Sequence, residues 1–184
     1  MNRLVKASPN RTAKRDAGKF IDVYDEPGHL IRRAQQIAVS MFHSTMRNGV
    51  TPIQYCVLRV LQYHPGIDQV TLASLCALDT STAADLAVRL EEHGLVRRMM
   101  PMKSKRHRLL QLTPEGATLV KRLVPCAYVL SRRLLRALNK KEQGIFLRLL
   151  KKFVHLNNQE SRAPLDRKFS GLRNDKSNVR AKRA

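Results

Sequence analysis

The chain has 184 residues, of which 43% are apolar, so it is long enough for one domain with helical extensions, and wholesale disorder is excluded. Lys and Arg number 35 against 14 Asp and Glu, a formal charge of +21 that repels itself in a compact state. Binding to a polyanion relieves this repulsion, and nucleic acid is the most common polyanionic partner. The charge therefore favours a nucleic-acid-binding protein over a soluble basic protein that binds no polyanion. Aromatic residues make up only 5%, which suits a helical core better than a β-sandwich.

No run of about 18 apolar residues occurs, which predicts that no helix spans a membrane. The basic N-terminus is not followed by an apolar stretch, so it does not look like a secretory signal. The three cysteines are an odd number without a CxxC pair, and we interpret them as reduced thiols inside the cell.

The first 24 residues are polar, basic and weakly patterned, which indicates a loosely ordered arm. From Pro27 to Thr45 apolar residues recur at helical spacing, so a long amphipathic helix is predicted, ended by Asn48 and Gly49.

Three shorter helices follow, each with its own start signal. Thr51 and Gln54 can form a capping box, Asp68 can cap the next helix, and Asp79 precedes the last, which ends at Gly94. The last of the three carries a narrow apolar face on one side and a small polar opening turn.

After Gly94 the period changes to that of extended chain. Strands are predicted at 95–100 and 108–112 around a turn at 101–107, and two further helices begin at Thr113 and Asn139. Three short helices followed by a two-stranded hairpin describe a winged helix-turn-helix. The predicted fold is therefore mainly α, and the flanking helices need a further surface to bury their apolar stripes.

The helix after Asp79 has the features of a recognition helix. Such a helix enters the major groove with its N-terminus first, where the short hydroxyl side chains of Thr80, Ser81 and Thr82 can approach bases and phosphates. The alternative is that these residues only cap the helix. Asp85 either accepts a hydrogen bond from a cytosine N4 or pairs with Arg89.

The hairpin is the sharper signal, because six Lys or Arg and no acidic residue lie between Leu95 and Thr113. Against DNA these charges displace counterions, and at the tip they reach the minor groove or its phosphates. The alternative is a solvated charged turn. The predicted DNA contacts are Thr80, Ser81, Thr82, Asp85 and Arg89 in the helix, and Lys103, Ser104, Lys105, Arg106 and Arg108 in the hairpin.

No catalytic constellation is visible, and the six histidines lack a metal-binding spacing such as HExxH, so we expect neither an enzyme nor a cofactor. Cys56 and Cys76 fall on or near apolar helix faces and are interpreted as buried structural thiols, whereas Cys126 is a candidate for a more accessible thiol. Two alternatives to a DNA-reading regulator stay open: a thiol-switched regulator of the same fold, and a general nucleic-acid-binding basic protein.

From about residue 30 to 156 the chain resembles the MarR family of bacterial regulators. The segments that carry the resemblance are 51–58, 79–96 and 106–116. The family's wing often pairs an acidic residue with an arginine; here Ser104 stands near the acid's place. The family also often has arginine where Thr80 stands, so a DNA contact is altered or absent.

The resemblance implies a homodimer that places two recognition helices in successive major grooves of a pseudo-palindromic operator, in the cytoplasm of a bacterium. It also implies repression relieved by a small aromatic or phenolic acid, because residues 25–36 resemble members that govern aromatic-acid catabolism. The residues that would line the ligand pocket are His29, Arg33, Met41 and Tyr55.

The expected organisation has three parts. They are a basic N-terminal arm (1–24), a MarR-type domain (25–157) with dimerisation helices at about 27–48 and 114–157 around a winged helix-turn-helix (51–113), and a basic C-terminal tail (158–184).

Overall fold

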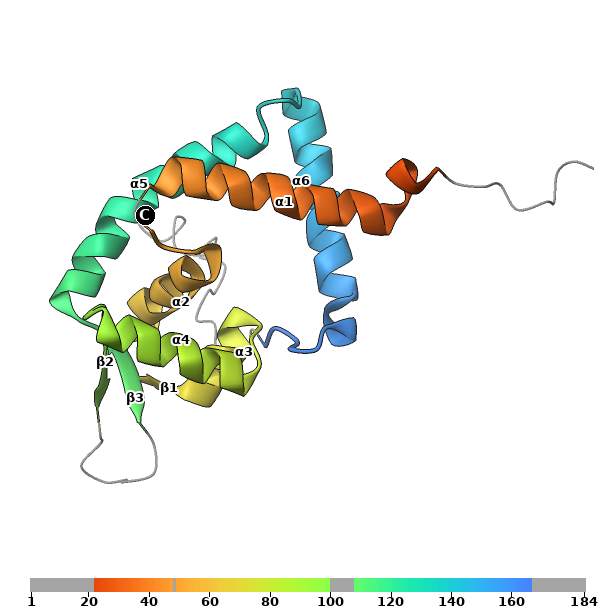
Figure 1. The fold of residues 1–184 in the computed structure, drawn as a ribbon. Helices are drawn as coiled ribbons and strands as arrows, with labels where there is room; N and C mark the ends of the chain where they lie inside the picture. The colour runs from red at the N-terminus through yellow and green to blue at the C-terminus, as the bar shows by residue number, and fades with distance from the viewer. Residues whose placement is uncertain (1–21, 48, 100–107, 167–184) are drawn as a thin grey trace, which may run out of the picture. The chain divides into compact units, whose positions relative to one another are not determined.

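The computed structural model describes residues 22–47, 49–99 and 108–166 (Figure 1). Lys103, Ser104, Lys105 and Arg106 of the predicted hairpin lie outside the described residues. The elements in chain order are η1 (Val23–Asp25), α1 (Pro27–Met46), α2 (Pro52–Tyr63), β1 (Ile67–Asp68), α3 (Gln69–Cys76), α4 (Thr80–Glu92), β2 (Val96–Met99), β3 (Leu109–Leu112), α5 (Pro114–Leu134), α6 (Lys140–Leu156) and η2 (Asn158–Glu160).

The helices begin where the capping residues predict. Thr51 Oγ1 accepts from the Gln54 backbone N at 3.3 Å, and Gln54 Oε1 accepts from the Thr51 N at 2.9 Å, which completes the predicted capping box. Asp68 likewise caps α3 by accepting from two backbone N–H groups. Local hydrogen bonds therefore define these boundaries without help from distant parts of the chain.

The wing is a three-stranded antiparallel sheet with the order β1-β3-β2. The predicted pairing of β2 with β3 is confirmed, with Val96 opposite Leu112 and Met99 opposite Leu109. Strand β1 was not predicted, because two residues are too short to show a period of two. It forms because β3 supplies its partners, with Ile67 opposite Leu110 and Asp68 opposite Leu109.

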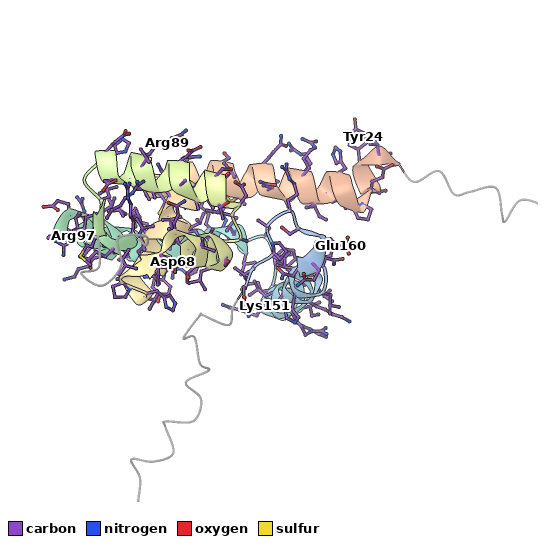
Figure 2. The ribbon with its side chains drawn as sticks, turned by 90° about the horizontal axis from the view of Figure 1, so that it is seen from below. Tyr24, Asp68, Arg89, Arg97, Lys151 and Glu160 are labelled. Atoms are coloured by element: carbon purple, nitrogen blue, oxygen red, sulfur yellow. The ribbon has the colours of Figure 1, made fainter. Side chains whose placement is uncertain are left out.

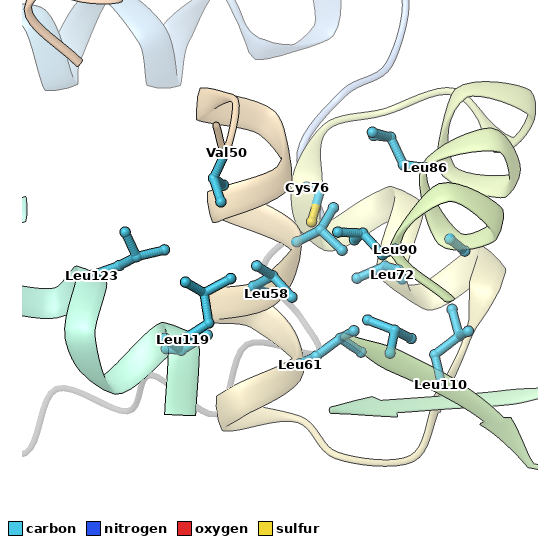
Figure 3. Packing of buried hydrophobic residues seen from close by; sticks show 14 of the residues in the cluster. Val50, Leu58, Leu61, Leu72, Cys76, Leu86, Leu90, Leu110, Leu119 and Leu123 are labelled. Atoms are coloured by element: carbon cyan, nitrogen blue, oxygen red, sulfur yellow. The ribbon is translucent and has the colours of Figure 1, made fainter. Parts of the chain in front are cut away.

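The core lies between α2, α3, α4, the wing sheet and the first half of α5 (Figure 3). Leu58, Leu61, Leu72, Leu90 and Leu110 are completely buried in it. Each such leucine contributes about 1.5–3 kcal/mol by leaving water. The narrow apolar face predicted for α4 is confirmed, and the residues that form it are Ala83, Leu86, Ala87 and Leu90.

Gly116 lets α5 start directly against the backbone of Leu95, the residue before strand β2. A Cβ atom on Gly116 would overlap the backbone oxygen of Leu95, which accepts from the Thr113 N at 3.1 Å. We expect Gly116→Ala to lower the free energy of unfolding by about 2–4 kcal/mol, because backbone atoms must move apart. Urea unfolding followed by circular dichroism measures the change.

The matched control is Gly28→Ala in α1, where no atom lies within 4 Å of an added Cβ. This substitution is expected to change the free energy of unfolding by less than about 1 kcal/mol. Equal effects of the two substitutions would contradict the close packing at Gly116.

The second half of α5 and the whole of α6 leave large apolar side chains uncovered. No residue of α6 is buried. Among the described residues, no helix is both long and apolar enough to cross a membrane. The exposed apolar residues of α6 are Ile145, Phe146, Leu147, Leu149, Leu150, Phe153, Val154 and Leu156.

The chain divides into two compact units within α1, after Ala38. In the described part of the first unit, Asp22 caps η1 by accepting from the Tyr24 N at 3.0 Å. The ring of His29 packs edge-on against Tyr24, with 5.5 Å between the centroids. The second unit contains the winged helix-turn-helix together with α5 and α6.

Candidate nucleic-acid interface

Asp79 organises the N-terminus of α4. Its carboxylate accepts from Ser81 Oγ at 2.5 Å, from the Thr82 N at 2.8 Å and from Thr82 Oγ1 at 2.7 Å. These hydrogen bonds, the one from Ser81 first, hold the pKa of the Asp79 carboxyl well below its usual range. While they persist, the two hydroxyls have donated their protons and can offer only lone pairs to a base edge.

Removing this cap is expected to lower stability and to flatten its pH dependence. Because the folded pKa of Asp79 is depressed, its contribution is complete above the unfolded pKa of about 4 and is lost as the pH falls through the folded pKa. We expect Asp79→Ala to lower the Tm at pH 7 by roughly 2–5 °C, and to have a smaller effect at pH 3.

The control is Asp79→Asn, because asparagine caps a helix as well as aspartate does but carries no charge. Its Tm at pH 7 is expected to lie near that of the unaltered chain. Thermal unfolding at both pH values measures the effect, and an Asp79→Ala loss that does not depend on pH would contradict the role of the carboxylate.

The face of α4 that points away from the core is polar, with one exception. Ser81, Asp85 and Arg89 are exposed, and Arg89 lies on the outer side of the helix (Figure 2). The described residues form one ion pair, between Arg98 and Glu91, so Asp85 is not paired with Arg89 there. The exception is Val88, which is 40% exposed and which the sequence analysis missed.

The side chain of Arg98 is mostly buried and is paired within the protein, so it is not one of the basic side chains that the wing exposes. Its Nε lies 3.1 Å from Glu91 Oε2, and its backbone N donates to Glu91 Oε1 at 3.3 Å. The Nε and Nη2 atoms are buried without an aligned hydrogen bond, so charge attraction holds this pair together. The pair joins the end of α4 to β2. Arg97 of β2 is exposed (Figure 2), and so is Arg108, the residue before β3.

A second cluster of functional interest surrounds Tyr55 on α2. Its half-buried ring lies 6.1 Å from that of Phe42, and burial raises the pKa of its hydroxyl while the charge of Arg59 opposes that change. Met41, also predicted for the pocket, is half-buried in the same unit. The phenol therefore lies beside an aromatic ring, with the cation of Arg59 one helical turn away.

Sequence reasoning missed Arg59 and favoured two residues of the other unit. Arg59 donates to Gln62 Oε1 at 2.5 Å and to the Tyr63 hydroxyl at 2.9 Å, and lies over the Tyr63 ring. Its place four residues after Tyr55 was the available signal. His29 and Arg33 belong to the first unit, where Arg33 donates to Gln36 Oε1 at 3.0 Å.

The cysteines are all free thiols. Cys76 is buried and Cys56 is half-buried, and a hydrogen bond from Cys76 lowers the pKa of the Cys56 thiol to about 7. Cys126 is half-buried and donates to the Arg122 carbonyl at 3.7 Å. Within the described residues, no group of three or more His, Cys, Asp or Glu side chains could hold a metal ion.

A helix-turn-helix whose second helix exposes a polar face beside a basic wing defines a winged helix-turn-helix protein. The MarR family model matches residues 48–106. The transcriptional regulator HosA of Escherichia coli is 33% identical over 106 residues, which cover 58% of this chain and 78% of HosA. The HTH-type transcriptional repressor NicR of Pseudomonas putida is 31% identical over 134 residues, which cover 72% of this chain and 85% of NicR.

The chain is also similar to a solved structure of a DNA-binding regulator. It is that of BpsR from Bordetella bronchiseptica, in work on the regulation of its DNA binding by 6-hydroxynicotinic acid. It has 29% identity and a TM-score of 0.67, and the match covers 72% of this chain and 96% of BpsR. The chain belongs to the MarR family of transcriptional regulators. It is a DNA-binding regulator, and the family is not one of enzymes.

Proposed function

We propose that the chain is a ligand-responsive repressor that binds a pseudo-palindromic operator as a homodimer. The observation that carries the dimer is α6, which leaves eight large apolar side chains exposed and buries none. Each is already about half covered, so a partner adds roughly 1 kcal/mol per side chain. Eight from each of two copies then offset the 4–15 kcal/mol that association costs.

A second copy also supplies the geometry for a two-fold operator. Each protomer would insert α4 into one of two major grooves a helical turn apart, while its wing would contact the adjacent phosphates. The dimerisation helices would be those at about 27–48 and 114–157, which precede and follow the DNA-reading unit at 51–113 along the chain. The proposed contacts remain Thr80, Ser81, Thr82, Asp85 and Arg89 on α4, and Lys103, Ser104, Lys105, Arg106 and Arg108 on the wing.

The effector that fits the Tyr55 cluster is a small aromatic acid. The half-buried Met41 and the ring of Tyr55, which packs against the buried ring of Phe42, would provide apolar contact, and Arg59 would provide a cation for the carboxylate. His29 and Arg33 of α1 are further candidates. BpsR, whose DNA binding is regulated by 6-hydroxynicotinic acid, supports a ligand of this class.

Selection of bound duplexes from a random pool tests the operator. We expect a two-fold symmetric consensus whose half-site centres lie about 10 base pairs apart. Sedimentation velocity of the same sample is expected to give twice the 21.0 kDa mass of one chain. An asymmetric consensus, or a monomer that binds it, would contradict the proposal.

Titration with 6-hydroxynicotinic acid tests the effector class. It is expected to release the selected duplex from the unaltered chain, whereas Arg59→Gln should require at least tenfold more acid. Cyclohexanecarboxylic acid, which keeps the carboxylate but lacks the aromatic ring, is the control. Release by both acids at equal concentration would argue against an aromatic pocket.

A further inference from the structure

The outermost line of α4 has an unusual composition for a surface that faces DNA. Ser81, Asp85, Val88 and Glu92 are exposed at spacings of four, three and four residues, which places them along one side of the helix. The buried residues of the same helix occupy the opposite side. This outward stripe contains no Lys or Arg side chain that could pair with a phosphate, so it is not suited to contact the DNA backbone.

Val88 is the only apolar side chain of the stripe. It is 40% exposed, and its neighbours along the stripe are the carboxylates of Asp85 and Glu92, so the stripe itself offers no continuous apolar surface to another protein. The major groove offers one apolar group at its base edges, the C5-methyl of thymine. A branched aliphatic side chain on the groove-facing side of a recognition helix matches that methyl group.

Asp85 has a carboxylate that can only accept hydrogen bonds, and it is not ion-paired among the described residues. Cytosine presents an N4 donor in the major groove without an adjacent acceptor. Adenine sets its N6 donor beside the N7 acceptor, and guanine presents two acceptors that would repel a carboxylate. Of the four bases, cytosine therefore suits Asp85 best.

The spacing allows both contacts at once. Asp85 and Val88 are three residues apart, or about 4.5 Å along the helix axis, which compares with about 3.4 Å between base pairs. We propose that α4 reads a cytosine through Asp85 and a thymine through Val88 at neighbouring or next-neighbouring base pairs of each half-site. This inference rests on the proposed function, in which α4 lies in the major groove of an operator.

Deoxyuridine in place of thymine tests Val88, because deoxyuridine lacks only the C5-methyl. The probe is the consensus duplex selected by the unaltered chain, with the thymine of both half-sites replaced. Loss of one methyl contact is expected to weaken binding about fourfold, and about fifteenfold for the two half-sites. Val88→Ala should bind the two duplexes equally, and Val88→Thr, which keeps one methyl, should fall between.

The matched control for Val88 is Val70→Ala, because Val70 is an exposed valine on α3, outside the stripe. That variant is expected to discriminate thymine from deoxyuridine as strongly as the unaltered chain. Asp85→Asn provides an independent test, because asparagine pairs with the N6 and N7 atoms of adenine. A repeated selection should then replace the cytosine by adenine in each half-site.

The outcomes separate this inference from the proposed function. A symmetric consensus that binds equally well with deoxyuridine, or that Asp85→Asn does not alter, would overturn the assignment of bases and leave the dimeric repressor standing. Failure of the unaltered chain to select any consensus would overturn both. A consensus with cytosine and thymine, whose recognition moves with the two substitutions, supports the inference.

Discussion

Phe153→Glu on α6 is expected to turn the dimer into a monomer and to weaken operator binding by at least about 100-fold. Phe153 is 50% exposed in the single chain and lies in the middle of the uncovered apolar face. A second copy that packs there would have to bury a carboxylate without a partner, at a cost of several kcal/mol. Each monomer then binds one half-site independently, so binding of the first recognition helix no longer raises the effective concentration of the second at its own half-site.

Arg148→Gln is the matched control, because it makes the same change of formal charge in the same exposed helix, away from the side of Phe153. It is expected to leave both the mass in sedimentation and the operator affinity unchanged. Circular dichroism should give the same helix content for both variants. A dimeric Phe153→Glu variant with full affinity would show that another surface joins the protomers.

The double substitution Lys105→Ala with Arg106→Ala is expected to weaken binding to every duplex and to flatten its salt dependence. These residues lie outside the described residues, and the prediction comes from the charge of the hairpin in the sequence. Two phosphate contacts contribute about 1.8 to the slope of log K against log salt, so this much should disappear for each protomer. Binding of consensus and random duplexes from 50 to 300 mM salt measures both slopes.

The control for the wing is Lys140→Ala with Lys141→Ala at the start of α6, which removes the same charge from a different element. This variant is expected to keep the slope to within about 0.5. The consensus should still be preferred over random DNA after the wing substitutions, because sequence choice is proposed to reside in α4. Equal losses of affinity and of preference would contradict this division between wing and helix.

The starts of the helices could be predicted because the interactions that define them are local. Thr51 with Gln54, and Asn139 with Glu142, bond within four residues of one another, and the apolar period of α4 follows from its own 13 residues. A two-residue strand has no such period. Strand β1 exists only because residues about 40 positions later supply its partner.

In the candidate site too, features set by neighbouring residues could be predicted, whereas features set by residues distant in sequence could not. Charge and motif order in the chain were enough to predict a winged helix-turn-helix with a basic hairpin, since like charges and start signals are properties of neighbouring residues. Only packing paired Arg98 with Glu91, made the Tyr55 side chain half-buried, and left Val88 uncovered on α4. Those facts depend on which elements lie against each other, because burial and pairing are set by residues distant in sequence.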